Sequence, residues 1–295
     1  MTADTLEVSS SHDRSQDAAA VPGIGRRLAA DPLALTGLLV VIAFAVAAIA
    51  APFIAPFDPV TVDPANRLAG PSGDHLLGTD PLGRDVLSRL LFGARWSLGA
   101  SATAAVLIVT LGLAVGVVAG YVGGWIDQLL MRIVDLLLGF PSLILALAIA
   151  GALGPGIENV LLGLVVVWWV DYARIVRGLV LTLREREFVE AARALGCSPF
   201  HVMRRHLLPH VFPPILILAT IEMGSLILAL AGLNFLGLGV QPPTPEWGAM
   251  INEGRRYLGT APHLMLYPGL AITTVVIGFN LLGDGLRDVL DPRTD

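Results

Sequence analysis

Long apolar runs alternate with shorter polar segments along this chain, a pattern typical of a polytopic membrane protein. Each run is long enough to cross about 30 Å of hydrocarbon as a helix that rises about 1.5 Å per residue. The pattern predicts an all-α fold with about six transmembrane helices. Their expected ranges are residues 32–54, 98–122, 133–153, 157–175, 211–238 and 264–282.

The polar segments predict how the chain is divided. Residues 1–31 are polar, small and without periodicity, which predicts a disordered tail. Residues 32–96 are expected to hold the first helix and a long outer loop, residues 97–288 the membrane core, and residues 289–295 a short tail. The first run is long for the apolar part of a signal peptide and therefore predicts a retained helix, although its alanine-rich end leaves cleavage open.

Composition agrees with a membrane protein, because 55% of the 295 residues are hydrophobic and only 15% are charged. Acidic and basic residues are spread over the loops, so no charged block favours nucleic acid. The single cysteine, Cys197, has no partner thiol in the chain for a disulfide or a zinc site. We therefore expect no cofactor, no metal and no nucleic-acid partner, with membrane lipid around the helices.

All 19 basic residues are arginine. A Walker A phosphate-binding loop requires a lysine, so the chain is not expected to hydrolyse ATP by itself. Lysine Schiff bases and lysine general bases are excluded for the same reason. No catalytic residue is predicted.

The arginines also predict the orientation. With six spans, thirteen arginines lie on the side of the two termini and six lie on the other side. Because cytoplasmic loops carry the excess of positive charge, both termini and the loop at residues 184–209 are expected in the cytoplasm.

The loop at residues 184–209 predicts a short helix, a tight turn and a second helix. Gly196 is suited to a left-handed turn at the end of the first helix. Ser198 is placed to cap the second helix, with Pro199 at its first position and Pro209 expected to close it. Three interpretations compete here: a solvated loop, a DNA-binding helix-turn-helix, and a surface that docks onto a cytoplasmic partner. The neighbouring spans disfavour the DNA-binding interpretation, because they would keep the pair out of a major groove.

Several sequence blocks carry a family resemblance. In the loop these are Glu190-Ala191-Ala192, Gly196 and Leu208-Pro209, which resemble the EAA loop of binding-protein-dependent ABC importers. Further blocks are HLLGTDPLGRDVLSRLLFGARWSL, GGWIDQLLMRIVDLLLGFPSL, NFLGLGVQPPTPEWGAMINEGRRYL and FNLLGDGLRDVLDPR. Together they resemble the C-type permease subunit of dipeptide and oligopeptide ABC importers over almost everything after Asp31. His206 replaces the isoleucine of generic EAA loops, and the Arg205-His206 pair is similar to peptide and nickel permeases.

This resemblance implies a permease subunit in the inner membrane of a prokaryote. The implied partners are a homologous permease subunit, two ATP-binding cassette subunits that hydrolyse ATP, and an extracytoplasmic peptide-binding protein. The residues implied to couple the permease to the ATPases are Glu190, Ala191, Ala192, Gly196, His206, Leu208 and Pro209. Nickel, glutathione or cell-wall peptides are alternative cargos within the same architecture.

Other candidate residues lie outside the loop. Glu222 falls near the middle of the fifth span, where a carboxylate is costly, which favours either a role in the translocation path or a buried contact between helices. Relatives carry an acid later in this helix, where this chain has Leu230. Asp135 is a further candidate for the translocation path or an interface, with a helix contact favoured, and Pro141 is expected to kink the third span. An ion-coupled secondary transporter is a further alternative, and Glu222 would be its best coupling residue.

The outer segment around Trp247 predicts a short helix capped by Thr244, with Pro245 at its first position. In the resembled family this region lies near the mouth that receives substrate. Pro245, Glu246 and Trp247 are therefore candidate contacts to the binding protein, while the alternative is that Trp247 only anchors the loop.

Overall fold

The computed structural model describes residues 31–290, and within that range the chain is helical apart from loops and one isolated bridge between Thr79 and Asp85. The long helices are α2 (Pro32–Ile54), α3 (Val86–Val122), α4 (Gly124–Leu138), α5 (Ser142–Leu153), α6 (Ile157–Leu183), α9 (Leu208–Phe235) and α11 (His263–Leu290). The short elements are η1 (Pro64–Asn66), α7 (Glu187–Ala194), α8 (Pro199–Val202), η2 (Met203–Leu207), α10 (Trp247–Gly254) and η3 (Arg255–Tyr257). The predicted all-α fold is confirmed.

The number of spans also agrees with the sequence. Five helices are long and apolar enough to cross a membrane, and the count within residues 31–290 rises to 6 if the bent pair α4 and α5 is one span. Most of the predicted tail at residues 1–31 lies outside the described residues. Residues 289 and 290 of the predicted C-terminal tail belong to α11, and the rest of that tail is not described.

Helix α3 begins at Val86, well before the expected start at residue 98. The side chain of Asp85 caps it by accepting a hydrogen bond from the Ser88 amide at 2.7 Å. Arg89 and Arg95 interrupt the apolar pattern there, so hydropathy alone misses the first turns. A helix of 37 residues is about 55 Å long and extends well beyond the hydrocarbon.

The predicted third span is two helices. Instead of a kink at Pro141 within one continuous helix, α4 and α5 meet at 88° and Pro141 stands at the N-cap of α5. A proline ring removes one backbone donor and clashes with the preceding turn, so the helix stops instead of bending gently. The start of this segment is also earlier than expected, at Gly124.

Helix α6 runs to Leu183, past the expected end at residue 175, and ion pairs to α4 stabilise its extension. Arg177 binds both carboxylate oxygens of Asp127, with nitrogen–oxygen distances of 2.5 and 2.7 Å. Arg174 binds Asp135 at 2.7 Å. Asp135 therefore contacts α6, while its role in the translocation path or an interface stays a prediction.

Close packing of α3 against α6 depends on small residues. Gly112, Gly116 and Gly120 are buried one turn apart on α3. A Cβ added at Gly116 would lie 2.6 Å from the Ala173 carbonyl oxygen and 2.6 Å from the Val176 Cβ. Glycine at this position lets the two backbones approach, as in small-xxx-small pairs of membrane helices.

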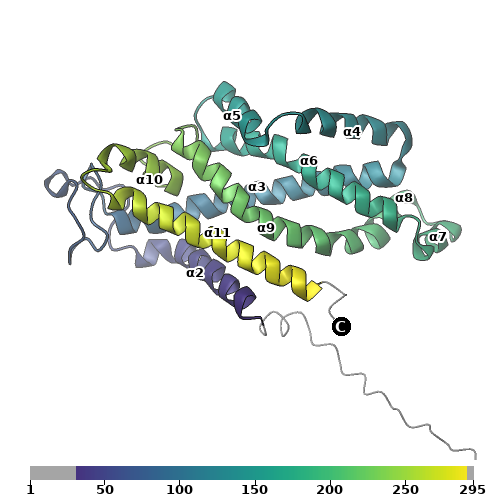
Figure 1. The fold of residues 1–295 in the computed structure, drawn as a ribbon, viewed down its shortest axis with the longest axis horizontal. Helices are drawn as coiled ribbons and strands as arrows, with labels where there is room; N and C mark the ends of the chain where they lie inside the picture. The colour runs from purple at the N-terminus through teal and green to yellow at the C-terminus, as the bar shows by residue number, and fades with distance from the viewer. Residues whose placement is uncertain (1–30, 291–295) are drawn as a thin grey trace, which may run out of the picture.

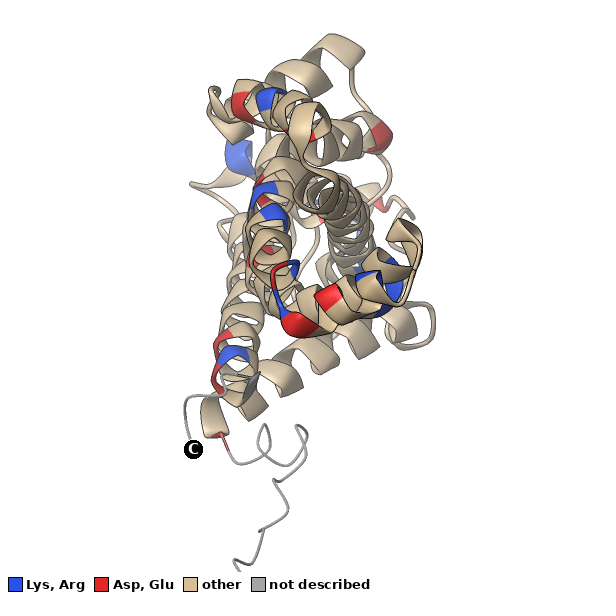
Figure 2. Ribbon diagram, turned by 90° about the vertical axis from the view of Figure 1, so that its right-hand side faces the viewer, with Lys and Arg blue, Asp and Glu red and all other residues tan. Residues whose placement is uncertain are grey.

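The bundle is elongated and has two distinct ends (Figure 1). Helices α7 and α8 lie at one end, whereas α10 and the loop between α2 and α3 lie at the other. Helix α2 packs antiparallel to α11, since Ala34 approaches Gly285 and Val40 approaches Gly278. The N-terminal end of α2 and the C-terminal end of α11 therefore both point toward the α7–α8 end. Figure 2 looks onto that end and shows acidic and basic positions on the α7–α8 loop.

Candidate functional site

The turn between α7 and α8 is a Schellman motif centred on Gly196. The Cys197 amide donates to the Ala192 carbonyl at 3.1 Å, and the Gly196 amide donates to the Arg193 carbonyl at 2.9 Å. Gly196 has φ of 80°, the left-handed conformation that glycine adopts without strain. The sequence-based prediction for this turn is confirmed, and the turn sets the direction of α8.

Helix α8 begins as predicted, with Ser198 accepting a hydrogen bond from the His201 amide at 3.3 Å and Pro199 at the first position. The prediction that Pro209 closes this helix is wrong. A π-helical segment, η2, follows α8 directly and leads into α9. Pro209 lies at the first turn of α9, where its missing N–H costs little. The loop therefore joins a long helix without a break.

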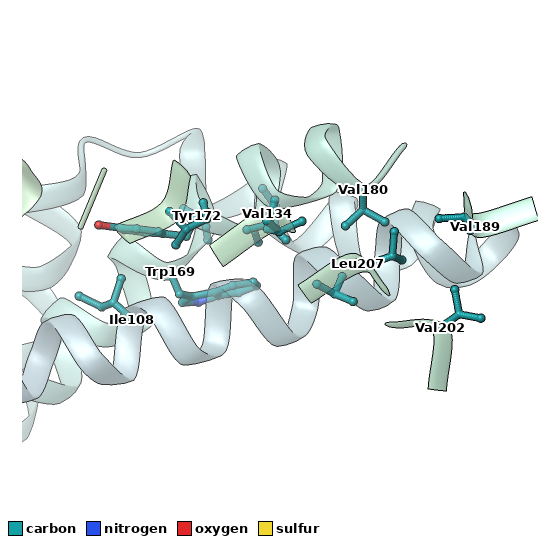
Figure 3. Packing of buried hydrophobic residues seen from close by; sticks show 14 of the residues in the cluster. Ile108, Val134, Trp169, Tyr172, Val180, Val189, Val202 and Leu207 are labelled. Atoms are coloured by element: carbon teal, nitrogen blue, oxygen red, sulfur yellow. The ribbon is translucent and has the colours of Figure 1, made fainter. Parts of the chain in front are cut away.

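The loop has an inner and an outer face. Val189, Ala192, Val202 and Leu207 are buried in the same apolar cluster as Val180 of α6. Figure 3 shows Val189, Val202, Leu207 and Val180 gathered at one end of this cluster. Buried apolar contacts of this kind hold the loop to the bundle.

The outer face presents a mixed apolar and charged surface. Leu195 is 84% exposed and Phe200 is 67% exposed, on either side of the Gly196 turn. Of the residues that the resemblance selects, Glu190, Ala191, Gly196 and Pro209 are exposed, His206 and Leu208 are partly buried, and Ala192 is buried. The structure thus brings these residues together in one loop but divides them between its exposed and its buried face.

An aromatic group that the sequence analysis missed lies beside this surface. The ring of Phe188 stacks on His210 with centroids 5.0 Å apart and lies 6.4 Å from the His206 ring. The Nδ1 atom of His210 is 2.7 Å from the His206 carbonyl oxygen. These contacts join α7 to the start of α9. The spacing of His206 and His210, one helical turn apart, was the available signal.

Two contacts tie the loop to the end of α3. The guanidinium of Arg193 lies over the Tyr121 ring, 5.0 Å from its centroid. Arg184 donates from Nη1 to the Gly120 carbonyl oxygen at 3.1 Å. Movement of α7 would therefore be transmitted to α3 as well as to α9.

Glu222 lies partly buried on α9, which packs against α6. No ion pair joins Glu222 to another residue in the described part of the chain. Leu230, further along the same helix, is buried in apolar contacts. The two interpretations of Glu222, path or helix contact, both stay predictions.

At the opposite end, α10 differs from its prediction. Its N-cap is Glu246, whose Oε2 accepts from the Ala249 amide at 2.9 Å, and neither Thr244 nor Pro245 has the predicted position. The helix starts later because Ser97 of α3 donates to Glu246 Oε1 at 2.7 Å and fixes the carboxylate there. Burial is the largest influence on the Glu246 carboxyl and raises its pKa above the ordinary value, against the effect of these hydrogen bonds.

The three residues proposed to contact a binding protein are buried in this conformation. Glu246 is 0% exposed and Trp247 is 1% exposed, and Pro245 is buried beside them. The Trp247 indole donates to the Leu90 carbonyl at 3.0 Å and packs edge-on against Phe44. Their contact to a binding protein stays a prediction, while their position assigns them to the support of this end of the molecule.

The described residues offer exposed apolar and charged side chains on the loop and apolar grooves beside the helices. Among residues 31–290 no group of three or more His, Cys, Asp and Glu side chains is arranged to hold a metal ion. Two apolar grooves of about 420 and 470 Å³ run beside α3, and both are lined by Thr110 and Leu113. One lies against α9 and α11, and the other reaches Phe200 and Arg204 of the loop.

Comparisons with known proteins agree with this arrangement. Residues 112–295 match the family described as binding-protein-dependent transport system inner membrane component, and residues 23–71 match the N-terminal transmembrane domain of oligopeptide transport permease C. The chain is 43% identical over 268 residues to the dipeptide transport system permease protein DppC of Alkalihalophilus pseudofirmus, covering 91% of this chain and 88% of that protein.

Two further relatives have other names. The nickel transport system permease protein NikC of Escherichia coli K12 is 46% identical, covering 87% of this chain and 92% of that protein. The glutathione transport system permease protein GsiD of Escherichia coli O6:K15:H31 is also 46% identical, covering 91% of this chain and 89% of that protein. Among solved structures, the inward-facing MetNI methionine ABC transporter matches with a TM-score of 0.55 and 23% identity, covering 70% of this chain and 98% of that chain.

Proposed function

Because the chain belongs to the family of binding-protein-dependent transport system inner membrane components, and is thus a multi-pass permease subunit of an ABC importer, we propose that it forms a passage for di- and oligopeptides. The passage is formed together with a homologous membrane subunit. The match of residues 23–71 to the N-terminal domain of an oligopeptide permease supports the peptide cargo.

The observation that carries the mechanism is the continuity of the α7–α8 loop with α9. The exposed side of the loop presents Glu190, Leu195 and Phe200, which suit a groove on an ATP-binding subunit. Its buried side is fixed to the bundle through Val189 and Val202. Closure of the ATPases on ATP would move the loop, and the unbroken helix from Pro199 to Phe235 would carry that motion into the membrane core.

Two cytoplasmic ATP-binding subunits would supply the energy. The chain has no lysine for a Walker A loop, which supports ATP hydrolysis by separate chains. No cofactor of its own is required by this mechanism. An extracytoplasmic binding protein would deliver the cargo at the α10 end.

The orientation follows from the fold together with the arginine bias. Both ends of the described chain point toward the α7–α8 end, where arginines are frequent. We infer that the termini and this loop are cytoplasmic in a prokaryotic inner membrane. A reporter fused after Asp295 should be active only in its cytoplasmic form, and one inserted near Asp63 only in its exported form. The reverse pattern would overturn the orientation.

Nickel and glutathione stay alternative cargos, because relatives of similar identity carry those names. The test is copurification of the assembled importer from the native membrane, followed by mass spectrometry of subunits and bound ligand. Uptake into vesicles would then be compared for a labelled dipeptide, labelled glutathione and nickel ions. Peptide uptake that excess glutathione and nickel leave unchanged supports the proposal. Uptake restricted to nickel or glutathione would overturn the peptide cargo.

A further inference from the structure

The end of the molecule that carries α10 has an open pocket of about 410 Å³. Its lining comes from the loop before α3, the segment before α10, the end of α10 and the η3 turn, all outside the apolar parts of the spans. Four charged residues contribute to it, namely Arg84, Glu253, Arg255 and Arg256, together with Tyr257. The balance among these charges decides what the pocket can bind.

The first two charges are already neutralised within a buried ring of four. Arg84 and Arg89 each bind Oε2 of Glu253 at 2.8 Å, and both also approach Oδ2 of Asp80, at 2.5 and 3.5 Å. Two arginines and two carboxylates balance, and three of the four side chains are almost fully buried. The Glu253 charge is therefore committed to the ring and does not neutralise the rest of the pocket.

Arg255 and Arg256 are the charges that remain. Both are exposed on η3, and neither forms an ion pair with another residue between 31 and 290. Helix α10 leads directly into η3, and the start of α10 is bound to α3 through Glu246 and Trp247. The pocket thus presents two positive charges that no acidic side chain between residues 31 and 290 pairs with, and Tyr257 lies in the lining with Leu258 next to it, 57% exposed.

We propose that this pocket, in place of the buried Pro245, Glu246 and Trp247, docks carboxylate side chains on the surface of the extracytoplasmic binding protein. The inference rests on the proposed function, which supplies a binding protein at this end. Arginine and tyrosine are the side chains most frequent at the energetic centres of protein interfaces. Fixed positive charge at an exposed surface also accelerates and orients the approach of an acidic partner, with a strong dependence on salt.

The test uses the assembled importer in nanodiscs of phosphatidylcholine, titrated with the binding protein that copurifies with it. The variant Arg255→Glu/Arg256→Glu should weaken binding by about tenfold or more at low salt and flatten its salt dependence. The variant Arg255→Lys/Arg256→Lys keeps the charge and should stay within about threefold of the parent. Arg95→Glu reverses a single charge at this end but outside the pocket, and should leave the affinity unchanged. ATP hydrolysis without binding protein should be equal in all four proteins.

Three results would overturn the proposal. The first is an unchanged affinity of the double glutamate variant, and the second is an equal loss in the Arg95→Glu control. The third is a defect that appears only when the nanodiscs contain phosphatidylglycerol and is absent in phosphatidylcholine, which would make the pocket a site for anionic lipid. Failure of the proposed function would give a different result. The parent complex would then copurify with no binding protein or ATPase, and this would be seen before any variant is compared.

Discussion

The guanidinium of Arg193 lies over the ring of Tyr121, so helix α7 contacts the last turn of α3 through a cation–π interaction. The distance from the guanidinium carbon to the ring centroid is 5.0 Å. Arg193 belongs to the loop that we assign to ATPase contact, and Tyr121 belongs to the bundle. This pair is therefore a direct path between the two.

Replacing Tyr121 by leucine should loosen α7 without unfolding the bundle. A cation–π contact at an exposed site contributes about 0.5–1 kcal/mol, so the α7 amides should exchange hydrogen about two- to fivefold faster. Tyr121→Phe keeps the ring and should behave as the parent. Hydrogen exchange followed by mass spectrometry measures both, and equal protection in the leucine variant would show that this contact does not hold α7 in place.

Gly116→Ala should destabilise the packing of α3 on α6. The added methyl group would lie 2.6 Å from the Ala173 carbonyl oxygen, so the helices must separate, at a cost of about 1–3 kcal/mol. Gly99→Ala on the same helix is the matched control, because a Cβ there meets nothing within 4 Å. Thermal unfolding in detergent should show a lower midpoint only for Gly116→Ala. A similar midpoint for both variants would contradict the close approach.

Gly196→Val should impair assembly with the ATPase subunits while the membrane bundle remains folded. A Cβ at this position meets nothing within 4 Å, so the effect is purely conformational. A β-branched residue in a left-handed conformation costs about 1–2 kcal/mol, which would misdirect α8. Gly196→Asn tolerates that conformation and should assemble. Copurification of the ATPases and peptide uptake distinguish the variants. Normal uptake by Gly196→Val would favour the interpretation of the loop as a solvated segment with no role in coupling.

Glu190→Lys should lower transport by reversing a charge on the exposed face of α7. Glu185→Lys is its control, because Glu185 is exposed on the same loop before α7 begins and pairs only with Arg184 at 2.9 Å among the described ion pairs. ATP hydrolysis stimulated by the loaded binding protein is the measurement. Equal activity of the two variants would show that Glu190 does not contribute to the contact with the ATPase subunits.

The Glu246 carboxyl predicts a pH dependence of stability. Because burial raises its pKa in the folded state, folding takes up a proton between the ordinary and the raised value. The free energy of unfolding should therefore fall as pH rises through that window. Glu246→Gln should flatten this slope and keep the hydrogen bond from Ser97. Glu246→Leu leaves the Ser97 hydroxyl and the Ala249 amide without their acceptor and should cost about 1–3 kcal/mol. Melting temperatures measured across pH test the slope, and a parallel profile for the parent and Glu246→Gln would contradict it.

The sequence predicted the features that depend on local chemistry. Apolar runs indicated six spans, Gly196 predicted the left-handed turn, and Ser198 predicted the cap of α8. Each of these depends on residues only a few positions apart. The division of the chain into tails, outer loop and core stays a prediction, as do the roles of the individual coupling residues.

The features that the sequence did not predict depend on distant partners. Helix α3 begins early partly because Arg89 is neutralised by Glu253, a residue 164 positions away. Glu246 is buried because Ser97, 149 positions away, binds it. At Pro141 and Pro209 the local chemistry is compatible with more than one outcome, since a proline can break a helix, kink it or begin it, and the structure shows a break with an 88° bend at Pro141 and a helix start at Pro209.

The Schellman turn also places the single thiol of the chain. Cys197 is half-buried in the turn, directly after Gly196, and the sequence has no second cysteine. One maleimide-linked fluorophore or spin label would therefore report from the proposed site of force transfer without any cysteine being removed. The wild-type polypeptide thus already offers one labelling position in the turn between α7 and α8. The distance from this label to a label on an ATPase subunit could be followed during the ATP cycle.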